Sequence, residues 1–195
     1  MMTEAQWDAK LHIQTCGRDA ARADAYRYPY EPTPYSVLER LSDSGFLDEN
    51  NLLIDYGCGK GRVGFFLNHK LGCQCCGIEY DERIYVQAMD NLDAFGGDAV
   101  SFHCTHAEDF TVKDADAFYF FNPFSVEILR AVLGQILDSY YADSREMRLF
   151  FYYPSDEYVA YLMTNPFLMF VDEIDCSDLF DSNSERERIL IFEVC

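Results

Sequence analysis

The sequence lacks long apolar runs. No stretch approaches the ~18 residues that a membrane-spanning helix needs, and the longest runs, residues 117–121 and 149–153, have the length of strands. Residues 1–10 contain no apolar segment of the kind found in secretory signal peptides. We therefore expect a cytoplasmic protein without a membrane partner.

Basic residues are also scarce. Lysine and arginine total 15 against 34 aspartate and glutamate residues, which gives a formal net charge of −19. Such a surface repels phosphate backbones and anionic lipids and attracts cationic partners. The composition therefore favours solubility and predicts no nucleic-acid partner.

Paired cysteine motifs are missing as well. The cluster Cys73, Cys75 and Cys76, with His69 nearby, lacks the C-x2-C spacing of structural zinc sites, and we expect no metal. Without a secretion signal, reduced thiols are the default. This expectation covers all eight cysteines: Cys16, Cys58, Cys73, Cys75, Cys76, Cys104, Cys176 and Cys195.

What remains is a chain of 195 residues that is 49% hydrophobic and free of repeats or low-complexity segments. A chain of this size buries enough surface to fold without disulfides or metals. The sequence predicts one domain over residues 1–195. Its first 45 residues, helical and then extended, form a segment that could act as a lid.

Hydrophobic periodicity predicts alternating strands and helices. Residues 4–25 have a helical pattern, and Pro29, Pro32 and Pro34 then impose an extended stretch. A helix follows through Leu41. The next expected elements are strands at 52–56, 73–80, 100–104, 115–121, 148–153, 167–175 and 188–194. Helices are expected at 61–71 and 81–92 and after Ser125 and Ser155, and a polar loop is expected at 181–187.

Strands separated by helices favour a parallel sheet with right-handed crossovers. The last two predicted strands have only a loop between them and are expected to pair as an antiparallel hairpin. The predicted fold class is therefore α/β: a Rossmann-like doubly wound sheet of seven strands, five parallel plus a C-terminal antiparallel hairpin, with helices on both faces and one reversed strand at an edge.

A glycine-rich loop follows the first predicted strand. Gly57, Gly59 and Gly61 alternate after Asp55, and glycines let a backbone turn sharply and approach a ligand. The next helix begins there and offers free N–H groups. One glycine would suffice for an ordinary strand–helix turn, so three indicate a binding loop.

Glycine-rich loops of this kind bind dinucleotides, nucleotide phosphates or S-adenosylmethionine. The dinucleotide fingerprint fits only when it is shifted to begin at Gly59, and no Gly-Lys-Ser/Thr follows for a phosphate P-loop. Asp55 also opposes a bound pyrophosphate and suits a ligand with positive charge. S-adenosylmethionine carries an ammonium and a sulfonium and no phosphate, so it is the favoured cofactor.

Acidic residues lie at the end of the second predicted strand and just after the third. Glu79 could accept hydrogen bonds from ribose hydroxyls, and the ring of Tyr80 could pack against adenine. After the third strand, Glu108 in the stretch following His106 could reach the adenine amino group. Solvated surface acids are the simpler interpretation of either residue taken alone.

The fourth strand ends in Asn122-Pro123-Phe124. A buried asparagine amide needs partners, and its carbonyl could accept a hydrogen bond from an amino group of a substrate. The Pro123 turn would direct a backbone carbonyl to the same place. A turn that caps the next helix through Ser125 is the alternative interpretation.

Taken in chain order, these motifs resemble those of class I S-adenosylmethionine-dependent methyltransferases. The resemblance implies a methyltransferase whose cofactor contacts Asp55, Tyr56, Gly57, Cys58, Gly59, Gly61, Glu79, Tyr80, Ala107 and Glu108. Asn122, Pro123 and Phe124 are similar to the Asn-Pro-Pro-Tyr/Phe turn of enzymes that methylate amino nitrogens, which implies a catalytic role. Here the second proline is absent, and Ser125 follows Phe124. Residues 30–35 have a weaker likeness to protein-lysine methyltransferase-like proteins.

The expected function is methyl transfer to an amino nitrogen of a small molecule or of a basic protein. Two alternatives stay open. One is a module that binds S-adenosylmethionine without turnover, and the other is an NAD-linked oxidoreductase, against which Asp55 argues. Asn122 distinguishes the first alternative from an enzyme, because only an enzyme needs an acceptor pocket beside it.

Overall fold

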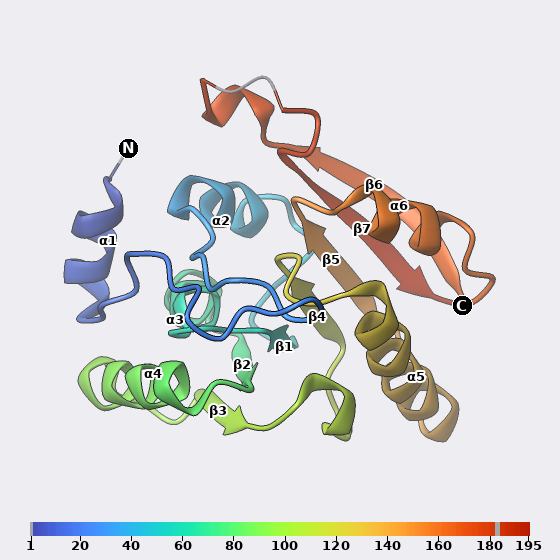
Figure 1. Ribbon diagram of the computed structural model, residues 1–195, viewed down its shortest axis with the longest axis horizontal. Coiled ribbons are helices and arrows are strands. Elements are labelled where there is room, and N and C mark those ends of the chain that lie inside the picture. The colour runs from blue at the N-terminus through green and yellow to red at the C-terminus, as the bar shows by residue number, and fades with distance from the viewer. Residues whose placement is uncertain (1, 182–183) are drawn as a thin grey trace.

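The computed structural model describes residues 2–181 and 184–195. Seven strands form one mixed sheet in the order β3-β2-β1-β4-β5-β7-β6 (Figure 1). The first five strands are parallel, and β7 is antiparallel to both of its neighbours. The strands are β1 (Leu52–Tyr56), β2 (Gln74–Glu79), β3 (Val100–Cys104), β4 (Ala117–Phe120), β5 (Arg148–Tyr152), β6 (Leu168–Asp175) and β7 (Arg188–Val194).

Helices cover both faces of the sheet, as predicted. One hydrophobic core joins one face to α1 (Glu4–Leu11), α2 (Tyr35–Ser42), α3 (Arg62–Leu71) and α4 (Glu82–Phe95). A second core joins the other face to α5 (Val126–Ala142), α6 (Asp156–Met163) and the short 3-10 helix η1 (Ala107–Asp109). A further 3-10 turn, η2 (Ser177–Leu179), follows β6.

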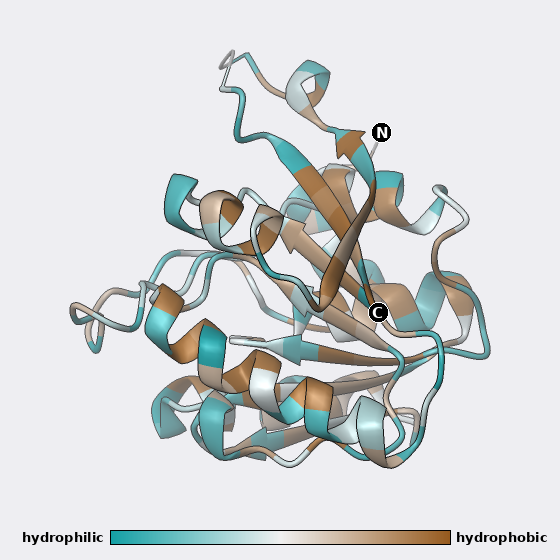
Figure 2. Cartoon of the chain, turned by 90° about the vertical axis from the view of Figure 1, so that its right-hand side faces the viewer, coloured by the Kyte–Doolittle hydropathy of each residue, from teal (hydrophilic) through white to brown (hydrophobic). Residues whose placement is uncertain are grey.

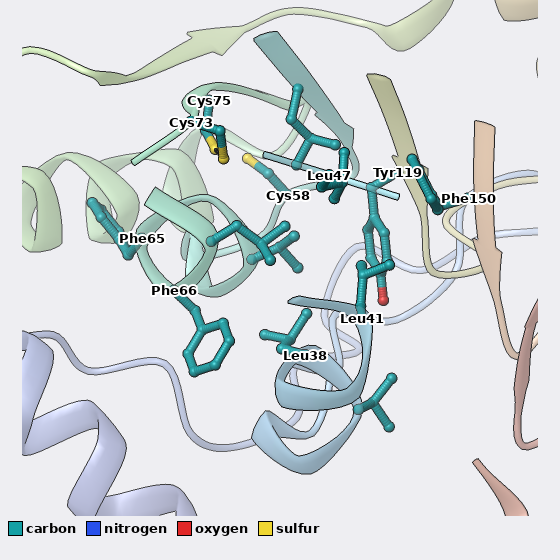
Figure 3. Close-up of a cluster of buried hydrophobic side chains, with 14 of the residues drawn as sticks. Leu38, Leu41, Leu47, Cys58, Phe65, Phe66, Cys73, Cys75, Tyr119 and Phe150 are labelled. Atoms are coloured by element: carbon teal, nitrogen blue, oxygen red, sulfur yellow. Dashed lines mark hydrogen bonds between the residues drawn. The ribbon is translucent and has the colours of Figure 1, made fainter. Parts of the chain in front are cut away.

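The central strands are buried on both sides. Along β4, Ala117 and Tyr119 belong to the first core, whereas Phe118 and Phe120 belong to the second. Strands buried on both faces have continuous apolar sequences instead of alternating ones, as parallel sheets require. Figure 2 shows mostly hydrophobic strands between helices of mixed hydropathy, and Figure 3 shows Leu38 and Leu41 of α2 within the first core.

The C-terminal hairpin is confirmed, but the predicted edge position of the reversed strand is wrong. Strand β7 lies between β5 and β6, so β6 forms the edge. The burial pattern gives the physical reason: the middle of β7, residues 189–192, is buried, whereas β6 is partly exposed along its length. The predicted polar loop at 181–187 includes residues 182–183, which lie outside the described residues.

The helix predicted for residues 4–25 is wrong beyond Leu11. Helix α1 ends at Leu11, because His12 adopts a left-handed conformation with φ of 59°. The buried carboxylate of Asp8 then accepts hydrogen bonds from the amide and the hydroxyl of Thr15, both at 2.7 Å. These side-chain bonds replace helical ones and turn the chain back over the sheet.

Among the described residues, no helix is both long and apolar enough to cross a membrane.

Candidate functional site

A cleft opens at the carboxyl ends of the parallel strands. Its floor comes from the loops after β1, β2, β3 and β4, including Gly57, Glu79, Ala107 and Pro123. Strands β1 and β4 are neighbours at the point where the strand order reverses. Ligands of open α/β sheets bind at such a topological switch point.

Residues 19–33, called the strap below, form the opposite wall of the cleft. In Figure 1 this blue segment between α1 and α2 crosses the ends of β1 and β4. An isolated antiparallel bridge between Arg27 and Phe124 attaches the strap to the turn after β4. The sequence predicted an extended segment here but did not predict which residues it would contact.

The glycine loop is packed against other parts of the chain. Gly57 and Gly59 have φ values of 73° and 56°, which favour glycine. A Cβ atom on Gly57 would overlap the ring of Pro123, and one on Gly59 would overlap the ring of Tyr30. The absence of side chains at these glycines thus lets the turn after β4 and the strap pack closely against the loop. The sequence had predicted that a ligand would occupy this space.

Glu79 connects the end of β2 to the glycine loop. Its carboxylate accepts hydrogen bonds from the amides of Gly59 at 3.0 Å and Asp81 at 2.9 Å. The residue is 5% exposed and lines the cleft. Burial raises the pKa of Glu79 above its usual value. Each carboxylate oxygen has a second lone pair that could accept a further hydrogen bond.

Asp55 is a buried carboxyl group with an unused oxygen. It lies in β1 opposite Gly77 of β2 and Tyr119 of β4. It lines the cleft, and its Oδ2 atom has no hydrogen-bond partner among the described residues. Burial, with a smaller contribution from the charge of Glu79, raises the pKa of Asp55 to about 8. A cation in the cleft would favour its ionised form.

The end of the cleft beside β3 contains Tyr80, Ala107 and Glu108, as the sequence predicted for one site. There, the guanidinium of Arg27 forms an ion pair with Glu108 at 3.0 Å and lies 3.1 Å from Nδ1 of His106. The hydroxyl of Tyr80 donates to the carbonyl of Arg22 at 2.6 Å. Two strap arginines therefore contact the residues expected to bind adenine, and no sequence motif indicated them.

The turn after β4 is strained and also covered by the strap. Asn122 has a φ of 45°, which is uncommon for a residue with a side chain. Its Oδ1 atom is buried without a partner among the described residues. The carbonyl of Pro123 accepts a hydrogen bond from the amide of Tyr28 at 3.1 Å, and the amide of Ser125 donates to the carbonyl of Tyr26 at 2.7 Å.

The structure brings most of the predicted site residues together, with exceptions. Asp55, Gly57, Cys58, Glu79, Tyr80, Ala107, Glu108, Pro123 and Phe124 line the cleft. Four others lie outside its lining: Tyr56, Gly59, Gly61 and Asn122. Tyr56 packs into the second core, where its ring stacks on Phe120 with 5.1 Å between centroids.

Arg62 is a further buried residue beside the cleft, at the first position of α3. Its side chain donates hydrogen bonds to the hydroxyl of Thr15 at 2.6 Å and to the carbonyl of Thr33 at 3.1 Å. It also pairs with Glu4 of α1. These contacts fix both ends of the strap to the helix that follows the glycine loop. An arginine directly after the glycine motif was the only sequence signal for this arrangement.

No family model matches the sequence, and no curated protein matches it. Solved structures do. An RNA methyltransferase from Salinibacter ruber in complex with S-adenosyl-L-homocysteine superposes with a TM-score of 0.55 and 19% identity over 84% of this chain and 94% of the other. A TehB-like S-adenosylmethionine-dependent methyltransferase from Corynebacterium glutamicum superposes with a TM-score of 0.58 and 16% identity, over 97% of this chain and 95% of the other. An rRNA methylase from Streptococcus thermophilus superposes with a TM-score of 0.56 and 14% identity, over 85% of this chain and 96% of the other.

At these identities the likeness shows the fold, which is the Rossmann-like fold of class I methyltransferases. One expectation from the sequence is wrong. The net charge of −19 predicts no nucleic-acid partner, yet methyltransferases named for RNA and rRNA share this fold. Net charge describes the whole surface, whereas recognition depends on the local site.

Proposed function

We propose that this protein is an S-adenosylmethionine-dependent methyltransferase. The observation that carries the proposal is the unpaired, buried oxygen of Asp55 in a cleft at the switch point of the sheet. A buried acceptor without a partner is costly, and a cationic ligand would supply one. The fold shared with methyltransferases supports the same assignment.

The lining of the cleft fits this cofactor better than it fits a dinucleotide. Glu79 and Asp55 both present carboxylate oxygens beside the glycine loop. A pyrophosphate gains nothing from two buried acids, whereas an ammonium group would favour the ionised form of Asp55 and ribose hydroxyls can donate to Glu79. In our assignment Asp55 faces the positive charge of the cofactor, Glu79 holds the ribose, and Tyr80, Ala107 and Glu108 hold the adenine.

The cofactor would supply a methyl group on a sulfonium, which is transferred by in-line displacement. The protein then has to orient the acceptor atom and exclude water. We assign the acceptor side to the turn of Asn122, Pro123 and Phe124. The Asn122 amide oxygen and the Pro123 carbonyl are hydrogen-bond acceptors, which suits an amino nitrogen whose lone pair must point toward the methyl group.

A second function has one observation in its favour. The Pro123 carbonyl is occupied by the Tyr28 amide, and the Asn122 oxygen is buried. A protein that binds S-adenosylmethionine without turnover would need neither atom. Transfer assays separate the two functions, because both share the cofactor cleft.

Two measurements test the proposal. Calorimetry with S-adenosylmethionine, S-adenosylhomocysteine and NAD should show binding of the first two, and loss of both in Asp55→Leu. Tritiated-methyl transfer into amines, proteins and RNA should then label one class of acceptor. Binding of NAD in preference to the sulfonium compound would refute the cofactor assignment, and binding without any transfer would favour the second function.

A further inference from the structure

The strap is a preformed loop closed on itself. The amide of Asp19 donates to the carbonyl of Tyr30 at 3.1 Å, and the amide of Tyr30 donates to the carbonyl of Asp19 at 2.8 Å. Inside the loop, the carboxylate of Asp24 accepts hydrogen bonds from the amides of Tyr26 and Arg27 at 2.7 and 2.8 Å. These bonds stay within the strap, so the segment can move as one unit.

The strap contacts both halves of the proposed active site. At the acceptor half, the Tyr28 amide occupies the Pro123 carbonyl. At the adenine half, Arg27 occupies the Glu108 carboxylate. A ligand that donates a hydrogen bond to the Pro123 carbonyl from the side of the strap must displace the Tyr28 amide. A ligand that donates to the Glu108 carboxylate from that side must displace Arg27. The closed strap therefore competes with cofactor and substrate together.

The contacts that hold the strap down are polar, apart from the ring of Tyr30, which packs against Gly59. No residue between Ile13 and Tyr35 belongs to either hydrophobic core of the described structure. Tyr26 is 55% exposed and Tyr28 is 36% exposed. Lifting the strap therefore breaks hydrogen bonds and an ion pair that water can replace, and it separates the Tyr30 ring from Gly59, without opening either hydrophobic core.

The two ends of the strap differ in stiffness, and the end at Gly17 provides a hinge. Gly17, just before it, has a φ of 96°, and a Cβ there would meet no atom within 4 Å. Pro32 and Pro34 stiffen the other end. Arg62 binds Thr15 before the strap and Thr33 at its end, so both attachment points stay fixed while the segment between them is free to swing.

We propose that residues 19–33 are a flap that opens to admit cofactor and acceptor, and that the Arg27–Glu108 ion pair is the latch that holds it closed. This inference rests on the proposed function for the identity of the ligands. Opening of the flap itself does not depend on them.

Amide hydrogen exchange followed by NMR tests the flap without any ligand. The amides of Tyr28 and Ser125 bridge the strap and the turn, and the amide of Ile54 in β1 reports on the core. We expect the two bridging amides to exchange at least ~100-fold faster than Ile54 relative to their intrinsic rates, since their opening is local. Equal protection of all three would overturn the proposal, because the strap would then be a fixed wall.

Arg27→Ala and Arg27→Gln test the latch. Both should speed exchange at Tyr28 and Ser125 several-fold and increase the association rate of S-adenosylhomocysteine. The matched control is Arg18→Ala, since Arg18 is exposed and its ion pair with Glu31 spans 3.8 Å. Unchanged exchange in both Arg27 variants would refute the latch. Faster exchange with no binding of S-adenosylhomocysteine to any variant would support the flap and refute the proposed cofactor.

Discussion

The carboxylate of Glu79 accepts a hydrogen bond from the amide of Gly59 at 3.0 Å. The last residue of β2 thus fixes the loop that follows the neighbouring strand β1. The bond is nearly inaccessible to water, since Glu79 is 5% exposed. The cleft is therefore organised by a side chain before any ligand arrives, which reduces the entropy lost on binding.

Glu79→Gln is expected to weaken cofactor binding at least ~10-fold, or about 1.4 kcal/mol. Glutamine has one acceptor oxygen where the carboxylate serves both Gly59 and Asp81, and its amide group would face a backbone N–H. Calorimetry with S-adenosylhomocysteine measures the change. The matched control, Glu82→Gln, alters an exposed acid three residues further on; equal affinities in the two variants would contradict the assignment.

Asp55 predicts an unusual pH dependence of stability. Burial, reinforced by the charge of Glu79, raises its pKa from 3.8 to about 8. Between these values the folded protein keeps a proton that the unfolded chain releases, so the contribution of Asp55 to the free energy of unfolding falls as pH rises. Above the folded pKa both states are ionised, and the contribution is then constant.

Urea unfolding of the wild type and Asp55→Asn at pH 5, 6.5 and 8 measures this contribution. The variant cannot titrate at this position, so its stability relative to the wild type is expected to rise steadily with pH. A difference that stays constant across the range would show that Asp55 titrates normally. Within the fold, asparagine is close in size to the protonated acid, which limits other changes.

Asn122→Gly is expected to leave cofactor affinity unchanged and to reduce methyl transfer at least ~100-fold, as expected for loss of an interaction made in the transition state. Glycine keeps the left-handed backbone of this position, where φ is 45°, and removes the side chain that carries the amide. Asn122→Ala has the same missing amide but adds backbone strain. Transfer that persists in both variants, measured with the acceptor found by the tritium screen, would remove Asn122 from the mechanism.

Gly59→Ala is expected to destabilise the protein by more than about 1 kcal/mol, because φ is positive there and the new Cβ overlaps the ring of Tyr30. Combining it with Tyr30→Ala removes the overlap and leaves only the backbone strain. The double variant should therefore be more stable than the sum of the single effects predicts. Simple additivity in urea unfolding would show that Tyr30 does not pack against Gly59 in solution.

The central strands were predictable from the sequence because their signals are local. The apolar run at Leu52–Tyr56 and the helix N-caps at Asp81 and Ser155 depend on neighbouring residues alone, and each of these caps accepts a hydrogen bond from a backbone amide of its own helix. The same holds for the acidic positions near the carboxyl ends of β1 and β2, since the topology of a parallel sheet places these ends together.

The strap was not predictable because its contacts join distant parts of the chain. Arg27 and Glu108 are 81 positions apart, and nothing local marks either as a partner of the other. The early end of α1 has a similar origin, because the buried Asp8 is also bound by the hydroxyl of Tyr35, at 2.6 Å. Tertiary hydrogen bonds here override a helical pattern in the sequence.

The placement of β7 between β5 and β6 has a consequence for the order of assembly. Residues 168–175 emerge from the ribosome before residues 188–194, yet among the described strands β6 pairs with β7 alone. Until β7 arrives, the nascent chain exposes the apolar rim of β5 and an unattached β6 segment that includes Met169 and Phe170. Unpaired strand edges of this kind promote pairing between molecules. A chain that stalls or is truncated after β6 and before β7 is therefore expected to be most prone to aggregate.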